Sequence, residues 1–245
     1  MNIFAPKRCY TYMNVITRNI PNAITCMNVA SGSVAIAMSF QQGEIAGLPA
    51  WGWACIFIAI AAVADFFDGF AARALHAYSD MGKELDSLCD LVSFGVAPAM
   101  ILFNCLRDLS PEAWICWAAL LIPVAGALRL ARFNIDTRQT TSFIGLPIPA
   151  NAIFWIGYTA MARQGTEFLS QWYVALAVIL VMCWLLNSPL HIFSLKFKTW
   201  GWKGNEARWL LILAAAGCVF CMGVPGLMWL IVFYVGCSLC PFSRR

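Results

Sequence analysis

Long apolar stretches fill most of the chain and restrict the folds open to it. Residues 50–64 and 91–103, for example, carry no charged side chain. A helix rises about 1.5 Å per residue, so about 20 residues of this kind cross the ~30 Å hydrocarbon core of a bilayer. The sequence therefore predicts an all-α fold, a polytopic membrane bundle of about eight transmembrane helices in one domain over residues 1–245. The expected spans are 22–40, 49–75, 84–105, 112–133, 147–163, 170–190, 207–221 and 224–240.

The composition agrees with a membrane protein. Hydrophobic residues make up 61% of the sequence and charged residues only 11%, whereas about 25% of the residues of soluble domains are charged. Most of the eleven cysteines lie inside apolar stretches, where a cysteine behaves as a small hydrophobic residue. The composition therefore excludes a soluble globular domain, and the cysteines do not indicate a redox compartment.

The basic residues predict the orientation of the chain in the membrane. With the N-terminus inside, all 16 lysines and arginines except Arg107 and Arg163 fall on the cytoplasmic side of the expected spans. Cytoplasmic loops of membrane proteins carry an excess of Lys and Arg, which favours cytoplasmic N- and C-termini. Residues 1–19 are expected to lie on the cytoplasmic surface of the membrane, and Pro21 stands where the first membrane helix can begin.

Four aspartates stand where one expected span ends and the next begins. Asp65 and Asp68 are three residues apart. Asp86 and Asp90 are four apart, so each pair projects from one face of its helix. At 1.5 Å per residue, the first pair lies roughly 10–15 Å before the intervening turn and the second roughly 6–12 Å after it. We therefore expect two facing carboxylate pairs at one depth, near the cytoplasmic edge of the membrane.

The surroundings of these acids favour a bound metal. A carboxylate close to hydrocarbon costs roughly 2.5–3.5 kcal/mol, and only Arg73 and Lys83 lie nearby in sequence to balance the four negative charges. Oxygen ligands suit a hard divalent cation such as Mg²⁺ or Mn²⁺ better than Zn²⁺. Separately solvated acids at helix ends are the alternative, but they leave the paired spacing and the neighbouring glycines unexplained.

The spacing around the acids resembles the signature of the CDP-alcohol phosphotransferase family. The matching pattern is Asp65-x2-Asp68-Gly69-x2-Ala72-Arg73-x8-Gly82-x3-Asp86-x3-Asp90, with no departure at any of its positions. The resemblance implies the helical membrane fold of that family, a homodimer, and a site with two ions of Mg²⁺ or Mn²⁺.

The resemblance also assigns roles to the residues of the signature. Asp65, Asp68 and Asp86 are implied metal ligands, and Asp90 is implied to be both a ligand and the general base. The implied cradle for a cytidine nucleotide consists of Gly69, Ala72, Arg73 and Gly82, with Asn22 of the first span as a further contact. Small residues let a ligand approach the backbone and an arginine can hold a phosphate bidentately, although small residues also serve helix packing in membranes.

Stretches downstream of the signature resemble the phosphatidylserine synthase branch of the family. They are residues 86–98, 128–134, 143–149 and 194–196. The resemblance implies transfer of the phosphatidyl group from CDP-diacylglycerol to L-serine, with CMP as the leaving group. Glycerol 3-phosphate, an inositol phosphate or choline as the acceptor alcohol remains an alternative.

Several basic and polar residues are candidates for binding the acceptor. Arg129 and Arg132 are three residues apart, so both guanidinium groups can face a carboxylate or phosphate at the level of the acids. Alternatively, both extend to lipid phosphates and set the topology. A serine site needs a cation and a hydrogen-bond acceptor, for which the candidates are Arg129, Arg132, Asn134 and Lys196, and a base, supplied by Asp90.

Two other hypotheses fit the sequence less well. A cation-coupled transporter predicts acids near the membrane midplane and two related halves, whereas these acids cluster at one edge and no internal repeat is present. Cys218-x2-Cys221 and Cys237-x2-Cys240 have a zinc-like spacing, but the expected hairpin separates them by roughly 20 Å. We therefore expect an enzyme of a bacterial or archaeal cytoplasmic membrane that binds CDP-diacylglycerol, L-serine and membrane lipid, and no nucleic acid.

Overall fold

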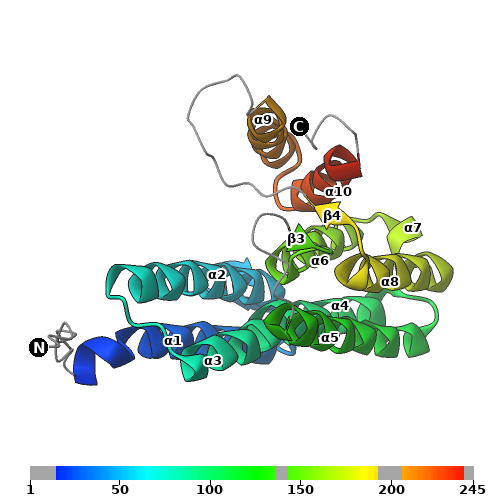
Figure 1. Ribbon diagram of the computed structural model, residues 1–245. Coiled ribbons are helices and arrows are strands. Elements are labelled where there is room, and N and C mark those ends of the chain that lie inside the picture. The colour runs from blue at the N-terminus through cyan, green and yellow to red at the C-terminus, as the bar shows by residue number, and fades with distance from the viewer. Residues whose placement is uncertain (1–14, 136–142, 193–205, 240–245) are drawn as a thin grey trace, which may run out of the picture.

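The protein is a bundle of helices, as the apolar stretches predict. The computed structural model describes residues 15–135, 143–192 and 206–239, and its regular structure is almost entirely helical (Figure 1). The helices are α1 (Val15–Ser39), α2 (Ala50–Ala74), α3 (Asp80–Asp90), α4 (Ala97–Leu109), α5 (Leu121–Ile135), α6 (Ile148–Arg163), α7 (Glu167–Ser170), α8 (Trp172–Asn187), α9 (Glu206–Met222) and α10 (Gly226–Leu239).

Helices occur at all eight places where spans are expected, but their lengths differ. Four are long and apolar enough to cross a membrane, and they are Asn19–Ser39, Ala50–Ala74, Asp80–Leu109 and Ala113–Ile135. The helices at the last four places, α6, α8, α9 and α10, have only 14–17 described residues. The prediction of about eight spans is therefore not confirmed by the described part of the chain.

The first helix begins earlier than the position of Pro21 suggests. α1 starts at Val15, so Pro21 lies in its second turn and not at its first position. Proline has no N–H, so at this position the helix lacks the hydrogen bond to the carbonyl four residues back. Residues 1–14 of the expected surface segment 1–19 lie outside the described residues.

The third long helix changes its winding in the middle. A π-helical turn, η1 (Leu91–Val96), separates α3 from α4, and the Ala97 N–H bonds to the carbonyl of Val92, five residues back. Pro98 stands in the first turn of α4, where an uninterrupted α-helix would bring its ring against the carbonyl of Phe94. The wider turn before the proline relieves that clash. Similarly, a 3₁₀ stretch, η2 (Ala113–Leu120), leads into α5.

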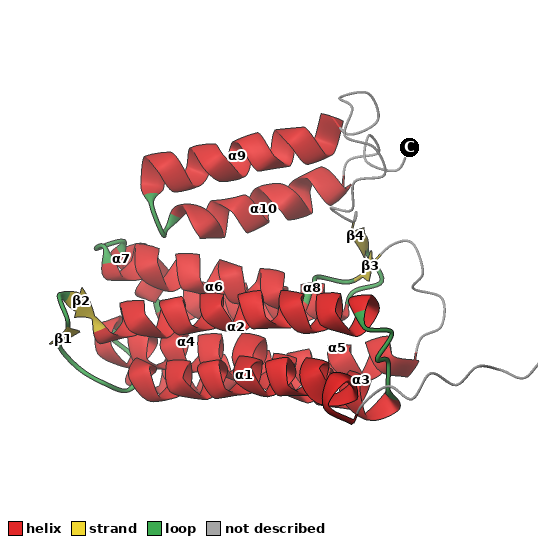
Figure 2. Cartoon of the chain, turned by 90° about the vertical axis from the view of Figure 1, so that its left-hand side faces the viewer, coloured by secondary structure: helices red, strands yellow, loops and turns green. Residues whose placement is uncertain are grey.

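Two short sheets lie at opposite ends of the bundle, in the connections between helices (Figure 2). At one end, β1 (Glu44–Ile45) pairs antiparallel with β2 (Leu48–Pro49), between α1 and α2. At the other end, β3 (Phe143–Ile144) pairs antiparallel with β4 (His191–Ile192), which follow α5 and α8. The turn between α2 and α3 lies at the β3–β4 end, and the site described below is near it.

Arg107 and Arg163, the two basic residues expected outside the cytoplasm, lie at the end of the bundle remote from the α2–α3 turn. Arg163 Nη2 lies 3.2 Å from Asp108 Oδ2, and Arg107 Nη2 lies 3.2 Å from Asp108 Oδ1. Arg163 also stands over the ring of Trp51, at 5.9 Å from its centroid. Both arginines are thus engaged with the same aspartate where α4 and α6 end.

α6 is the most enclosed helix of the described chain and joins the halves of the core. Trp155 and Tyr158 are fully buried in a cluster with residues of α4, α8 and α10, while Ile148 and Ala152 belong to a second cluster with α1 and α2. Gly157 lets the backbone of α10 approach, since a Cβ there would lie 2.2 Å from the Met228 nitrogen. This packing leaves α1, α2 and α3 together on one side of the bundle (Figure 1).

Candidate active site

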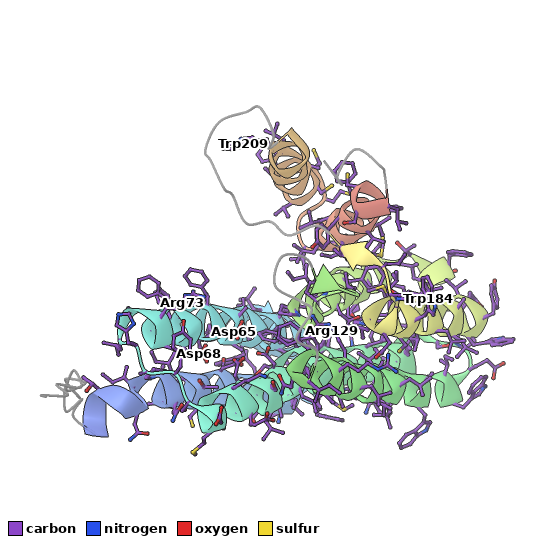
Figure 3. All side chains as sticks on the ribbon, in the orientation of Figure 1. Asp65, Asp68, Arg73, Arg129, Trp184 and Trp209 are labelled. Carbon is purple, nitrogen blue, oxygen red and sulfur yellow. The ribbon has the colours of Figure 1, made fainter. Side chains whose placement is uncertain are left out.

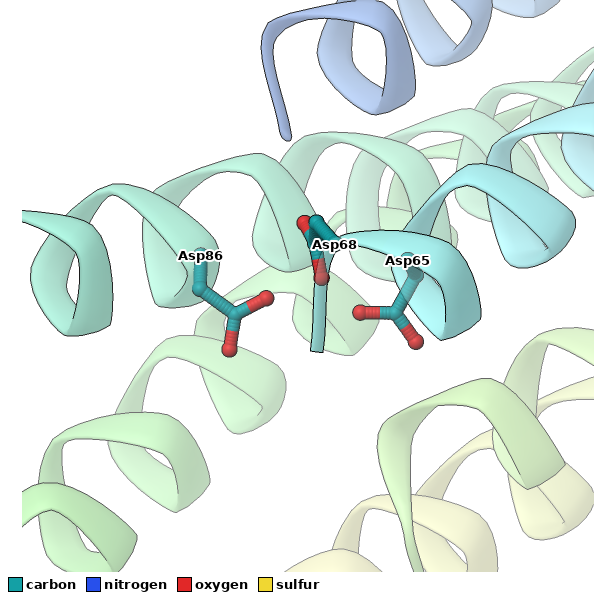
Figure 4. A group of neighbouring side chains, drawn as sticks. All are labelled: Asp65, Asp68 and Asp86. Atoms are coloured by element: carbon teal, nitrogen blue, oxygen red, sulfur yellow. The ribbon is translucent and has the colours of Figure 1, made fainter. Parts of the chain in front are cut away.

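Three of the four aspartates converge between α2 and α3. Asp65, Asp68 and Asp86 each offer a carboxylate oxygen, and these oxygens all lie within 4.8 Å of one another. Figure 4 shows the three side chains pointing toward a common centre. Asp86 of the second pair therefore faces both members of the first pair, as expected.

The connection between α2 and α3 explains this convergence. α2 ends at Ala74, and α3 begins after Ser79, whose hydroxyl accepts a hydrogen bond from the Gly82 N–H and caps the helix. Only five residues separate the two helices, and both pack against α1, with the cavity described below between them. Asp65 lies about 14 Å before the end of α2 and Asp86 about 9 Å into α3, at 1.5 Å per residue, which brings them to similar depths.

The chemistry of the cluster fits a divalent cation. Asp68 is only 5% exposed, and its Oδ2 accepts no hydrogen bond from any described residue. The salt bridges among the described residues include none of the four aspartates. Buried carboxylates without cationic partners are costly unless a metal neutralises them, so the donor set matches the one expected for Mg²⁺ or Mn²⁺.

Asp90 lies beside this group but has a different set of contacts. It interacts electrostatically with Asp65 and Asp86, and its Oδ1 accepts a hydrogen bond of 3.4 Å from Asn28 Nδ2 of α1. Its oxygens are not among those within the 4.8 Å group. A neutral donor from α1 therefore holds the Asp90 carboxylate.

A cavity of about 240 Å³ extends from the aspartates between α1, α2 and α3. All five residues expected to hold a nucleotide line it, and they are Asn22, Gly69, Ala72, Arg73 and Gly82. Asp68 and Asp86 lie in its wall as well. Figure 3 shows Asp65, Asp68 and Arg73 along α2. One cavity thus joins an acidic region to a region with an arginine, an arrangement suited to a metal-bound diphosphate.

The glycines of the cavity have the space that a ligand needs. A Cβ built on Gly69 would meet no atom within 4 Å, so this position faces open space. At Gly82, a Cβ would lie 3.0 Å from the Ser79 hydroxyl and 3.1 Å from Asn22 Oδ1. Gly82 therefore permits the helix cap and the approach of Asn22, while Gly69 leaves room in the cavity itself.

The four candidates for acceptor binding are placed differently from one another. Arg129 is 9% exposed in α5, interacts with Asp90 electrostatically, and stands 6.0 Å from the centroid of the Phe133 ring. Its Nε has no hydrogen-bond partner among the described residues. Arg132 is exposed and donates to the carbonyl and side-chain oxygens of Asn187, each at 3.4 Å. Lys196 lies outside the described residues.

The fourth candidate, Asn134, connects α5 to α3. Its amide nitrogen donates to Ser87 Oγ at 3.0 Å and to Glu84 at 3.4 Å, and its carbonyl accepts from Lys83 Nζ at 2.9 Å. These bonds hold α5 against the helix that carries Asp86 and Asp90. Of the α5 candidates, Arg129 is thus the one with an electrostatic interaction with an aspartate of the site.

Sequence reasoning missed a polar stripe on α1. Thr25 lines the cavity and Asn28 contacts Asp90. With Asn22, they stand at every third position along the helix. Polar residues at this spacing share one face of a helix. Polar side chains in an apolar span usually point into the bundle and mark a functional site, so the spacing itself is a signal that could have identified them.

Comparison with known proteins agrees with this geometry. A family model described as CDP-alcohol phosphatidyltransferase matches residues 18–184, a range that contains the aspartates, the cavity and Arg129. The chain is 32% identical to the CDP-diacylglycerol–serine O-phosphatidyltransferase of Mycobacterium bovis over 240 residues, which cover 92% of this chain and 78% of that protein.

Two further relatives extend the comparison. The enzyme of the same name from Bacillus subtilis is 49% identical over 130 residues, covering 53% of this chain and 69% of the relative. The archaetidylserine synthase of Methanothermobacter thermautotrophicus is 32% identical over 174 residues, covering 69% of this chain and 67% of the relative. With its long apolar helices, its aspartate cluster and these similarities, the chain is an integral membrane protein that belongs to the CDP-alcohol phosphatidyltransferase family.

Proposed function

We propose that the protein transfers the phosphatidyl group from CDP-diacylglycerol to L-serine, giving phosphatidylserine and CMP. The observation that carries the proposal is the single cavity in which the carboxylates of Asp68 and Asp86 adjoin Gly69 and Arg73. The names of the relatives, which include serine in bacterial and archaeal cases alike, support serine as the acceptor.

In the proposed reaction, Asp90 accepts the proton of the serine hydroxyl. The hydroxyl oxygen forms a bond to the phosphorus that carries the diacylglycerol, and the bond from that phosphorus to the oxygen of the CMP phosphate breaks. CMP leaves with the electron pair of the broken bond. Phosphatidylserine keeps the phosphorus, so atoms and charge are conserved without a further reactant.

The aspartate cluster is proposed to hold two ions of Mg²⁺ or Mn²⁺, with Asp65, Asp68, Asp86 and Asp90 as ligands. Bound ions of this kind neutralise a diphosphate and stabilise its leaving phosphate. Arg73 in the cavity wall adds a bidentate donor for a phosphate oxygen. Asn22, Ala72 and Gly82 line the same cavity and are proposed to contact the cytidine nucleotide.

Arg129 is proposed to bind the carboxylate of serine. Among the described acceptor candidates, it is the buried cation that interacts electrostatically with Asp90. Its Nε has no hydrogen-bond partner in the described chain. A buried guanidinium needs an anionic partner to offset its desolvation. The excess of Lys and Arg in the expected cytoplasmic loops supports a site at the cytoplasmic face, where free serine is available.

The direct test is CMP release by the purified protein in detergent, with CDP-diacylglycerol and Mn²⁺ or Mg²⁺. We expect release only when metal and L-serine are both present. Parallel reactions contain glycerol 3-phosphate, inositol phosphate or choline in place of serine. Release with only one of these alcohols would identify that alcohol as the acceptor and leave the mechanism unchanged. No release with any alcohol from a folded sample would refute the proposal.

Replacing Gly69 with alanine tests the nucleotide cavity. The new methyl group meets no protein atom within 4 Å, and alanine is favoured over glycine inside a helix by about 1 kcal/mol, so thermal stability should not fall. The methyl group occupies ligand space, and we expect KM for CDP-diacylglycerol to rise about tenfold or more. Gly217→Ala in α9, where a Cβ also meets nothing, is the matched control, and equal kinetics in both variants would count against the cavity.

A further inference from the structure

Asn28 is a buried polar residue of α1 outside the family signature. It is fully buried, and its Nδ2 donates to Asp90 Oδ1 at 3.4 Å across 62 residues of sequence. An amide placed in an apolar helix loses its hydration and is retained only where it has a specific partner. For this side chain, the partner in the described chain is the aspartate that the proposed reaction uses as its base.

The backbone of Asn28 is tied to the same stretch of chain. Ser93 of η1 donates from its hydroxyl to the Asn28 carbonyl at 3.1 Å, and Ser93 is fully buried. Asp90 and Ser93 are three residues apart, so the side chain and the carbonyl of one asparagine contact consecutive turns of one helix. Two reciprocal bonds of this kind fix both the height and the rotation of Asp90 relative to α1.

Gly32, one turn further along α1, makes this approach possible. A Cβ on Gly32 would lie 2.2 Å from Ser93 Oγ and 2.8 Å from Ser93 Cα, so any larger residue would push η1 away. The π-helical turn itself begins at Leu91, directly after Asp90. Turns of this type occur frequently at functional sites. Here the wide turn starts next to Asp90, the residue that Asn28 contacts.

Asn104 shows what a purely structural asparagine looks like in the same bundle. It is 2% exposed, and its Nδ2 donates to Ser39 Oγ of α1 at 3.3 Å and to the Met100 carbonyl at 3.0 Å. Like Asn28, it has an Oδ1 without a partner in the described chain. Both amides therefore join α1 to the third long helix, but only Asn28 does so through an aspartate of the site.

From these contacts we propose that Asn28 is a positioning residue, which orients the Asp90 carboxylate by holding its Oδ1 so that Oδ2 faces the acceptor hydroxyl. This inference rests on the proposed function, because it assigns Asp90 the task of taking the hydroxyl proton. A fixed carboxylate needs no rotation during the transfer, and misplacing a reacting group by about 1 Å can cost on the order of 10²-fold in rate.

The test compares Asn28→Leu with Asn104→Leu, since leucine is close to asparagine in size and lacks the donor. With Mn²⁺, CDP-diacylglycerol and L-serine, we expect Asn28→Leu to lower kcat by about 10- to 100-fold. KM for CDP-diacylglycerol and the binding of CMP with Mn²⁺ should stay within about twofold of wild type. Asn104→Leu should keep kcat within about twofold of wild type, even if its melting temperature falls as much as that of Asn28→Leu. Asn28→Asp, which retains the size but replaces the donor by an acceptor, serves if the leucine variant does not fold.

A double variant separates positioning from general damage. If Asn28 acts only through Asp90, then Asn28→Leu added to Asp90→Asn should lower the residual rate no further, because the group that it positions is already gone. Full additivity of the two losses would overturn the inference, as would an unchanged kcat in both Asn28 variants or equal losses in Asn28→Leu and Asn104→Leu. Failure of the wild-type protein to release CMP would instead refute the proposed function.

Discussion

Replacing Asp86 with asparagine is expected to lower the rate of CMP release by about 10³-fold or more and to weaken Mn²⁺ binding. Asp86 is one of the three aspartates whose oxygens lie within 4.8 Å, and it also lines the cavity. Ions held there are expected to supply several kcal/mol of transition-state stabilisation, and each 1.36 kcal/mol corresponds to about tenfold in rate. Rate and Mn²⁺ binding, followed by calorimetry on the same sample, measure the two effects together.

The control for this variant is Asp108→Asn at the other end of the bundle. Asp108 is an exposed aspartate in salt bridges with Arg107 and Arg163, and a surface ion pair contributes only about 0–1 kcal/mol to stability. We expect full activity and normal Mn²⁺ binding from this variant. If Asp86→Asn kept both as well, the cluster would not be the metal site.

The second large effect is expected from Asp90→Asn. Loss of a general base typically lowers a rate by about 10²–10⁴-fold, and asparagine has the size of aspartate and can still contact Asn28. CMP should continue to bind in the presence of Mn²⁺, within a few-fold of wild type, because Asp65, Asp68 and Asp86 and the cavity remain. The measurement is single-turnover CMP release beside equilibrium binding of CMP.

This division of roles distinguishes Asp90 from the other three aspartates. A loss of Mn²⁺ binding equal to that expected for Asp86→Asn would show that Asp90 acts chiefly as a ligand. Unimpaired turnover would remove it from the mechanism. A transporter would show no CMP release in the wild type, so neither variant could then lower it.

The sequence predicted the helices well where a stretch is long and apolar. The expected span 49–75 is α2, Ala50–Ala74, and 147–163 is α6, Ile148–Arg163. A continuous apolar stretch of that length has few alternatives in a membrane. The start of α1 was less well predicted, because proline marks a permissible helix start but does not prevent the helix from beginning earlier.

The candidate site was predicted as far as spacing along a helix can reach. Asp65, Asp68 and Asp86 face one another because a short turn joins α2 to α3 and both helices then run along α1. The contact between Asn28 and Asp90 spans 62 residues and depends on how α1 packs, which no local pattern specifies. The partners of Asn134 on α3 were unpredictable for the same reason.

The depth of the aspartates has a consequence for the lipid substrate. Asp65 lies about 14 Å from the end of α2, so we expect the phosphate of the proposed lipid donor to reach it from the side of the bundle. Withdrawing two chains of about 16 carbons into water would cost about 25 kcal/mol, at ~0.8 kcal/mol per methylene. A site at this depth lets the donor slide in sideways with its tails still solvated by neighbouring lipids, and the product can diffuse away along the same plane.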